Sequence, residues 1–246
     1  MKKLAIIFCL LLSAISILGC ANLSDNKANQ APMKSTSVDT AYLKKIHEKY
    51  FIAIKRLDKI FSDEMKLIEA KKVSDREYDD LLIKAINEKI LPEINKIANA
   101  IKQEKRATQE EMITLTHLSL FIEAEQKVYE AIIMSSERRG INFREILEPA
   151  FFEAAVGEYY YKKSYYKFVE NKDYQVLNKE KFDDLKKGDS FHEVSRKLAM
   201  PGKLEGTEMK GDRLVQTYVW HENSGANIKV KFIDNRMYSA EQSGLN

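Results

Sequence analysis

Apolar residues that recur at intervals of three and four constrain the fold of this chain more than any other feature. That spacing places apolar side chains on one face of an α-helix, and this face has to be buried. The chain contains four such series: Leu43, Ile46, Tyr50, Ile54, Leu57, Phe61, Met65 and Ile68; Leu82, Ile86, Ile90, Ile94, Ile97 and Ile101; Leu115, Leu118, Ile122, Tyr129 and Ile133; and Phe143, Leu147, Phe151 and Ala154. Residues 39–173 are therefore predicted to form an antiparallel four-helix bundle.

Capping residues indicate where these helices begin and end. Ser74 is followed three residues later by Glu77, and Thr108 is followed by Glu111, which is the pattern of a capping box. Gly140 follows the third series and is typical of a helix C-terminus. The connections between these signals are short, and short connections favour antiparallel neighbours.

Two prolines interrupt the helical pattern. Pro92 lies within the second series and is expected to kink that helix, because its ring would clash with the carbonyl of Glu88. Pro149 either kinks the fourth helix or marks the first turn of a new one.

The pattern changes after residue 173, where two short helices are predicted. Residues 178–186 favour one helix that ends before Gly188. Ser190 and Glu193 form a third capping box, and the helix that they open should stop at Pro201.

Strand signals follow these helices. Residues 227–233 alternate apolar and charged side chains, as in a strand with one buried face, and residues 213–221 are rich in strand-forming residues. Turn residues lie at 211–212, 223–225 and 234–235. Residues 174–246 are therefore predicted to form a small domain of two short helices and a three- to four-stranded antiparallel sheet. The fold class of the whole chain is predicted to be α+β.

Several short segments of this tail occur in an order known from one group of proteins. The segments are Phe182-Asp-Asp-Leu-Lys-Lys-Gly188, Ser190-Phe-His-Glu-Val194, Leu198-Ala-Met-Pro-Gly202, Thr217-Tyr-Val-Trp220 and Gln242-Ser-Gly-Leu245. With them, residues 178–246 resemble the β-lactamase-inhibitor-protein-like fold shared by SmpA/OmlA (BamE-like) lipoproteins. Ala199 stands where that group usually has glycine. The resemblance implies a role in binding other proteins and carries no active site, and no family is recognised for residues 39–172.

The beginning of the chain has the composition of a secretory signal. Lys2 and Lys3 precede an almost wholly apolar stretch over residues 4–18, which is too short for an ordinary spanning helix. The stretch ends in Leu18-Gly19-Cys20, which resembles the lipobox of bacterial lipoproteins. The resemblance implies that residues 1–19 are removed and that Cys20 is acylated and becomes the N-terminus. An uncleaved anchor helix is the alternative.

Residues 20–38 are small and polar and have no periodicity, so a flexible tether is predicted between the lipid anchor and the bundle. The protein is then expected to be exported and held on the cell membrane, facing outward. In an organism with two membranes the outer membrane is also possible. Cys9 and Cys20 are the two cysteines of the chain, so the mature protein is expected to lack a disulfide and a catalytic thiol.

Charge excludes one class of partner. The chain has 40 Lys and Arg residues against 37 Asp and Glu residues, and no segment forms a basic block. Nucleic-acid binding is therefore not expected.

No pattern of catalytic or metal-binding residues is apparent. His192-Glu193 begins like a zinc-protease motif, but Arg196 stands where the second histidine would be needed. The other histidines, His47, His117 and His221, are scattered. The acidic pairs Asp79-Asp80, Glu110-Glu111 and Asp183-Asp184 lie near helix starts, where carboxylates suit the helix dipole. No catalytic residue, metal or cofactor is therefore predicted.

A run of tyrosines in the fourth helix is the candidate interaction surface. Its consecutive members fan around the helix, so they cannot all face one core. In one interpretation the rings fill the bundle or pack against the tail. In the other, an exposed surface binds a partner through Tyr160, Tyr161, Tyr165 and Tyr166.

These patterns favour a non-catalytic envelope lipoprotein that binds an envelope protein. The alternative is a lipoprotein that binds a small ligand, such as a lipid or a peptidoglycan fragment, in a bundle pocket opened between the second and fourth helices at Pro92. A hydrolase is the third hypothesis, and a convergent carboxylate–histidine cluster would favour it.

Overall fold

The computed structural model describes residues 37–137 and 143–245. These residues all belong to one compact part of the chain. The predicted lipidation residue Cys20, the tether up to residue 36, and the predicted cap at Gly140 lie outside the described residues. Helices precede a four-stranded antiparallel sheet at the C-terminus, so the mixed helix-and-sheet class is confirmed.

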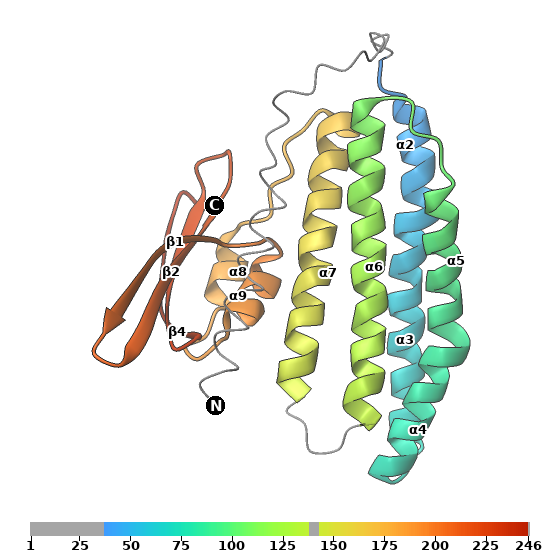
Figure 1. Cartoon of the computed structure of the whole chain (residues 1–246), viewed down its shortest axis with the longest axis horizontal. Helices are drawn as coiled ribbons and strands as arrows, with labels where there is room; N and C mark the ends of the chain where they lie inside the picture. The colour runs from blue at the N-terminus through green and yellow to red at the C-terminus, as the bar shows by residue number, and fades with distance from the viewer. Residues whose placement is uncertain (1–36, 138–142, 246) are drawn as a thin grey trace, which may run out of the picture. The chain divides into compact units, whose positions relative to one another are not determined.

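The helical region, residues 40–170, contains four long helical segments that lie side by side (Figure 1). Within the described residues, two π-helical turns, named η1 and η2, interrupt the first two segments, and a third, η3, ends the fourth. The elements are α2 Thr40–Ile46, η1 His47–Phe51 and α3 Ile52–Ala70; α4 Asp75–Ala85, η2 Ile86–Ile90 and α5 Leu91–Lys102; α6 Gln109–Glu137; and α7 Phe143–Tyr165 with η3 Tyr166–Glu170.

The apolar series predicted from the sequence forms the core of this region. Leu43, Ile54, Ile86, Leu115 and Ile122, which come from three different series, are fully buried. The helix α6 packs most extensively against α7 and also contacts α4 and α5, while α3 contacts α4. Gly157 of α7 allows a close approach to α6, because an added Cβ would lie 2.9 Å from the Cα of Phe121.

The prolines have different effects on the helices. Pro92 is the second residue of α5, and α5 directly follows η2, where the N–H of Leu91 donates to the carbonyl of Ile86. The irregularity expected at Pro92 thus takes the form of a wider π-helical turn, which accommodates a residue without an N–H. Pro149 lies inside α7, which continues through it as one helix.

Two predicted capping boxes are complete. The Thr108 hydroxyl accepts from the N–H of Glu111 at 3.2 Å, and the Glu111 carboxylate accepts from the N–H of Thr108 at 3.3 Å. Ser190 and Glu193 make the same pair of bonds at 3.1 and 2.8 Å. At Ser74 the structure shows the half in which the hydroxyl accepts from the helix.

The C-terminal region, residues 174–245, contains two short helices and four strands, and we use the name tail domain for it. Its sheet is antiparallel in the order β1-β2-β3-β4. The elements are α8 Lys179–Asp183, α9 Phe191–Leu198, β1 Lys203–Lys210, β2 Arg213–His221, β3 Asn227–Ile233 and β4 Arg236–Ser243. All three predicted turn segments connect strands, and Asp234 and Asn235 both have positive φ, as a two-residue hairpin turn needs.

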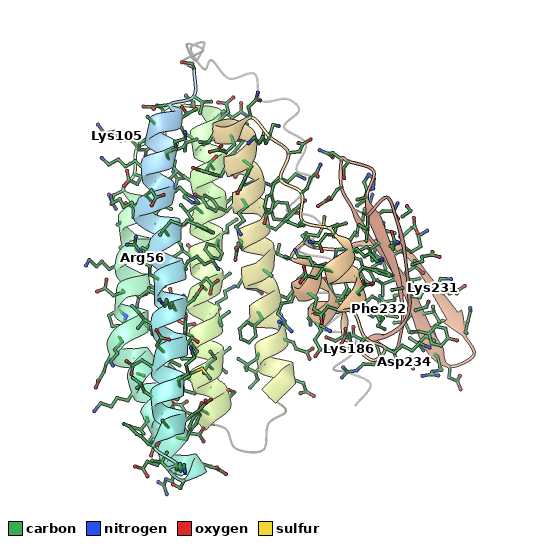
Figure 2. All side chains as sticks on the ribbon, turned by 180° about the vertical axis from the view of Figure 1, so that it is seen from behind. Arg56, Lys105, Lys186, Lys231, Phe232 and Asp234 are labelled. Carbon is green, nitrogen blue, oxygen red and sulfur yellow. The ribbon has the colours of Figure 1, made fainter. Side chains whose placement is uncertain are left out.

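Trp220 lies at the centre of the tail core. It is fully buried, and its indole N–H donates to the carbonyl of Met200 at 3.0 Å. Gly202 leaves room for the ring, because an added Cβ would lie 2.5 Å from it. On β3, Phe232 is buried whereas its neighbour Lys231 is exposed, so the predicted alternation is confirmed (Figure 2).

The helix α7 packs against α9 and joins the helical region to the tail domain. The Ser190 hydroxyl donates to the Glu148 carboxylate at 2.8 Å. Nearby, the ring of Phe152 lies 5.5 Å from that of Phe191 and 5.1 Å from that of His192. Residues of α9 and of its N-cap thereby contact α7 directly.

Candidate functional site

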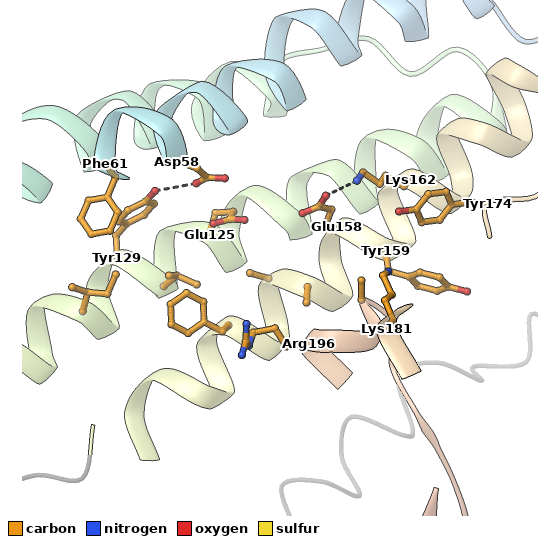
Figure 3. Close-up of a pocket in the computed structure, with 16 residues that line it drawn as sticks. Asp58, Phe61, Glu125, Tyr129, Glu158, Tyr159, Lys162, Tyr174, Lys181 and Arg196 are labelled. Atoms are coloured by element: carbon orange, nitrogen blue, oxygen red, sulfur yellow. Dashed lines mark hydrogen bonds and ion pairs between the residues drawn. The ribbon is translucent and has the colours of Figure 1, made fainter. Parts of the chain in front are cut away.

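A cleft of about 510 Å³ lies between the helical region and the helices of the tail domain (Figure 3). This volume is in the range of pockets that bind small molecules. The lining consists of Asp58 and Phe61 from α3; Glu125, Val128, Tyr129 and Ile132 from α6; Phe151, Ala154, Ala155, Glu158, Tyr159 and Lys162 from α7; Tyr174; and Lys181, Arg196 and Ala199 from the tail helices and the residue after them.

One part of the cleft is apolar. Phe61 packs edge-on against Tyr129, with ring centroids 5.1 Å apart. Val128, Ile132 and Phe151 continue this surface along α6 and α7. Such a strip offers apolar surface for a ligand to bury.

The wall formed by α3, α6 and α7 contains a network of charges. We name it the Lys55 network, with the members Lys55, Asp58, Glu125, Glu158 and Lys162. The Lys55 ammonium lies 2.8 Å from Glu158, 3.3 Å from Asp58 and 3.7 Å from Glu125. The Lys162 ammonium lies 2.7 Å from the other oxygen of Glu158. The network therefore combines two cations with three carboxyl groups.

The carboxyl groups of this network have different protonation behaviour. Burial, together with the nearby charge of Asp58, raises the pKa of Glu125 from 4.5 to about 7, although Lys55 acts in the opposite direction. Burial also works against ionisation of Glu158, but Lys55 and Lys162 outweigh it and lower its pKa. Glu158 is thus ionised at neutral pH, while Glu125 exchanges its proton there.

Asp58 has a further partner in the cleft. The Tyr129 hydroxyl donates to its carboxylate at 3.0 Å (Figure 3). Burial and the charge of Asp58 raise the pKa of the Tyr129 hydroxyl, so the hydroxyl keeps its proton as a donor.

The opposite wall carries cations from the tail domain. Lys181 of α8 and Arg196 of α9 line the cleft, and neither makes an ion pair with another described residue. Burial and the like charge of Lys162 lower the pKa of Lys181. We call Lys181 and Arg196 the cationic wall.

The four tyrosines predicted to form a surface are not all exposed. Tyr160 is 42 % exposed and Tyr166 is 37 % exposed, but Tyr161 is fully buried. The Tyr161 hydroxyl is hydrogen-bonded to the ring of His47 at 3.0 Å. The prediction that Tyr161 contacts a partner is therefore wrong, because this ring belongs to the core of the helical region.

The other tyrosines also point to different neighbours. Tyr165 is half-buried and stacks on His47, with ring centroids 4.4 Å apart. Tyr166 stacks on Tyr174, a residue of the cleft, at 5.2 Å. Tyr160 instead lies 5.7 Å from the ring of His117. These contacts fit the interpretation in which most of the rings pack within the protein.

The histidines have local structural contacts. His117 lies 3.2 Å from the hydroxyl of Ser164, and His192 lies against Phe152. Burial lowers the pKa of His47, His117 and His192. No histidine lines the cleft, and residues 37–137 and 143–245 contain no cluster of three side chains suited to hold a metal.

The cleft is not the pocket expected beside Pro92. Its lining includes no residue of α4 or α5. It lies instead where α3, α6 and α7 face the tail helices, and α7 and α9, which both line it, contact each other.

The sequence contained one signal for this site. Glu125 lies three residues after Ile122 and four before Tyr129, at the place where the third apolar series lacks a member. A charged residue at a core position is rare unless it is paired or functional. Lys181 and Arg196 had no comparable signal, because their place opposite α7 depends on how the tail packs.

Among the residues that the structure describes, no helix is both long and apolar enough to cross a bilayer.

Comparison of the chain with protein-family models, with curated proteins and with solved structures finds no match. The resemblance of the tail to BamE-like lipoproteins therefore stays a prediction, and function has to be inferred from the residues themselves.

Proposed function

We propose that this chain is a non-catalytic lipoprotein of the bacterial envelope, anchored through acylated Cys20, that binds a protein partner. In this proposal the helical region is an antiparallel four-helix bundle and the tail is a β-lactamase-inhibitor-protein-like domain. The sequence at Leu18-Gly19-Cys20 supports the anchor.

The observation that carries partner binding is the exposure of β1. All eight residues of this edge strand are exposed, and they include the apolar Leu204 and Met209. An edge strand offers unpaired backbone N–H and C=O groups along one side. A partner can add a strand there and use the apolar side chains for specificity.

In-cell crosslinking followed by mass spectrometry tests this proposal. The full chain is compared with a Leu204→Asp, Met209→Asp double variant and with Tyr238→Ser, which removes an exposed ring from β4 as a control. We expect one envelope protein to crosslink to the wild type and the control and to be lost with the β1 variant. Capture that is insensitive to the β1 variant would contradict the proposed surface.

The cleft favours a second candidate function, the binding of a small ligand. Its volume of about 510 Å³ and its mixture of apolar surface and charged walls are typical of ligand pockets. Both functions can coexist in one lipoprotein, since β1 does not contribute to the lining of the cleft.

A further inference from the structure

We propose that the cleft binds a short zwitterionic peptide, with its ammonium group at the Lys55 network and its carboxylate at the cationic wall. This inference deepens the second candidate function, ligand binding, and rests on it. Three features of the cleft define the ligand: an excess carboxyl group on one wall, excess cations on the other, and an apolar strip along α6 and α7.

The ammonium end is assigned to Glu125. This side chain is among the buried residues, with 8 % exposure, and it lines the cleft. Lys55 lies 3.7 Å away, beyond hydrogen-bond distance. Glu158 is held by Lys162 at 2.7 Å and Asp58 by Tyr129 at 3.0 Å. Glu125 is thus the carboxyl of the network with the weakest contacts, and a ligand ammonium would supply hydrogen bonds that Lys55 does not reach.

The carboxylate end is assigned to Arg196 and Lys181. Neither makes an ion pair with a described residue, and the half-buried Lys181 has Lys162 as a nearby like charge. An anion between them would relieve this repulsion. The planar guanidinium of Arg196 can bind a carboxylate through two parallel hydrogen bonds.

The view into the cleft places the two assigned ends on different walls. Glu125 and Glu158 project from α6 and α7, while Arg196 and Lys181 approach from the tail (Figure 3). Phe61, Ile132 and Phe151 provide apolar surface for a side chain of the ligand. A molecule with two opposite charges and an apolar group matches all three features.

A fatty acid or another apolar anion fits less well. It would satisfy the cationic wall and the apolar strip, but it would leave Glu125 without a donor. It would also bring no positive charge to a wall that has three carboxyl groups for two lysines. Opposite excess charge on the two walls therefore favours the zwitterion over the simple anion.

Isothermal titration calorimetry with the full-length chain in mild detergent tests the assignment. The probes are alanyl-phenylalanine with free termini, its N-acetylated form, its C-amidated form, and palmitate as the apolar anion. We expect the free dipeptide to bind, and each capped form to bind at least about tenfold more weakly, because each cap removes a charge-assisted hydrogen bond.

Two protein variants assign the ends of the ligand. With Glu125→Gln, the free and N-acetylated dipeptides should bind equally. With Arg196→Gln, the free and C-amidated dipeptides should bind equally. Arg56→Gln changes an exposed arginine of α3 outside the cleft and should leave all affinities unchanged. Circular dichroism of each variant checks that the fold is kept.

Several outcomes would overturn the proposal. Binding of palmitate in preference to every dipeptide would show that the cleft binds an apolar anion. That result would support small-ligand binding but contradict the proposal of a zwitterionic peptide. No binding of either class would remove the small-ligand function altogether. Dipeptide binding that ignores Glu125→Gln and Arg196→Gln would place the ligand elsewhere. None of these results bears on crosslinking through β1, which tests protein binding separately.

Discussion

The helical region and the tail domain each bury a glutamate, but the two carboxylates are used differently. Glu222 of the tail is 5 % exposed, and it accepts hydrogen bonds from the backbone N–H groups of Val176 and Leu177. Glu125 of the helical region is 8 % exposed and faces the cleft, where Lys55 at 3.7 Å is its nearest cation. Glu222 accepts hydrogen bonds from backbone groups of the tail, whereas Glu125 faces the cleft and has no backbone donor among the described residues.

This difference separates structural from functional burial of charge. When a buried carboxylate accepts hydrogen bonds from backbone N–H groups, these bonds compensate for the hydration that the carboxylate loses on burial. Glu111 behaves like Glu222, since it accepts from the N–H groups of Ala107, Thr108 and Asp39 at the start of α6. Glu125 lacks such backbone partners among the described residues, and its raised pKa reflects that difference.

The largest expected effect comes from removing the structural carboxylate. Glu222→Ala should leave the N–H groups of Val176 and Leu177 buried without an acceptor, and it should lower the free energy of unfolding by about 4 kcal/mol. Urea unfolding followed by tryptophan fluorescence measures this loss, because Trp220 lies in the same core.

Glu208→Ala is the matched control for this change. Glu208 is exposed on β1, so its removal should alter stability by less than about 0.5 kcal/mol. Equal effects of the two substitutions would mean that Glu222 is no more structural than a surface residue, and the distinction between the two buried glutamates would fail.

Glu125→Gln should raise the free energy of unfolding instead of lowering it, and the size of this gain should depend on pH. The pKa of Glu125 is raised from 4.5 to about 7, so its stabilising contribution is complete below pH 4.5 and is lost as pH rises through 7. The glutamine variant does not titrate there. It should match the wild type at pH 4.5 and be more stable by about 3 kcal/mol at pH 8.

Urea unfolding of both proteins at a series of pH values from 4.5 to 8 checks this expectation. Asp58, Lys55 and Glu158 surround Glu125 and are present in both proteins, so their own titration should largely cancel in the difference. If the two curves of unfolding free energy against pH were parallel, the pKa of Glu125 would not be raised in the folded protein. The contrast between Glu125 and Glu222 would then lose its support.

The sequence predicted the elements of both regions better than the site between them. The apolar spacing, the Thr108 and Ser190 caps and the hairpin turns depend on local rules, and the structure confirms them. Tyr161 was misjudged because three neighbouring tyrosines look alike in sequence, and only the packing of η1 against α7 decides which is covered. The cleft required the contact of α7 with α9, which no local pattern encodes.

Gly157→Ala should disturb the helical region and leave the tail untouched. A Cβ at this position would lie 2.9 Å from the Cα of Phe121, so α6 and α7 would have to move apart. Overpacking of this kind costs about 2 kcal/mol, which the better helix propensity of alanine offsets in part. Thermal unfolding should therefore show a lower midpoint, whereas an unchanged or higher midpoint would mean that the helices separate without cost.

The smallest expected effect is a gain in stability at the edge of the cleft. Ala199 ends α9 with φ of 53°, a left-handed conformation that is unfavourable for residues with a Cβ. Ala199→Gly should relieve this strain and raise the free energy of unfolding by about 1 kcal/mol, after allowance for the greater freedom of glycine in the unfolded chain. Urea unfolding checks the direction of this change in stability, and Ala240→Gly on β4 is the control that should destabilise the protein.

Because Ala199 also lines the cleft, dipeptide affinity measured on the same variant adds a second result. Greater stability with unchanged affinity would mean that the left-handed residue serves only to end the helix, whereas a change in affinity would show that the turn after α9 helps to set the position of Arg196 opposite Glu125.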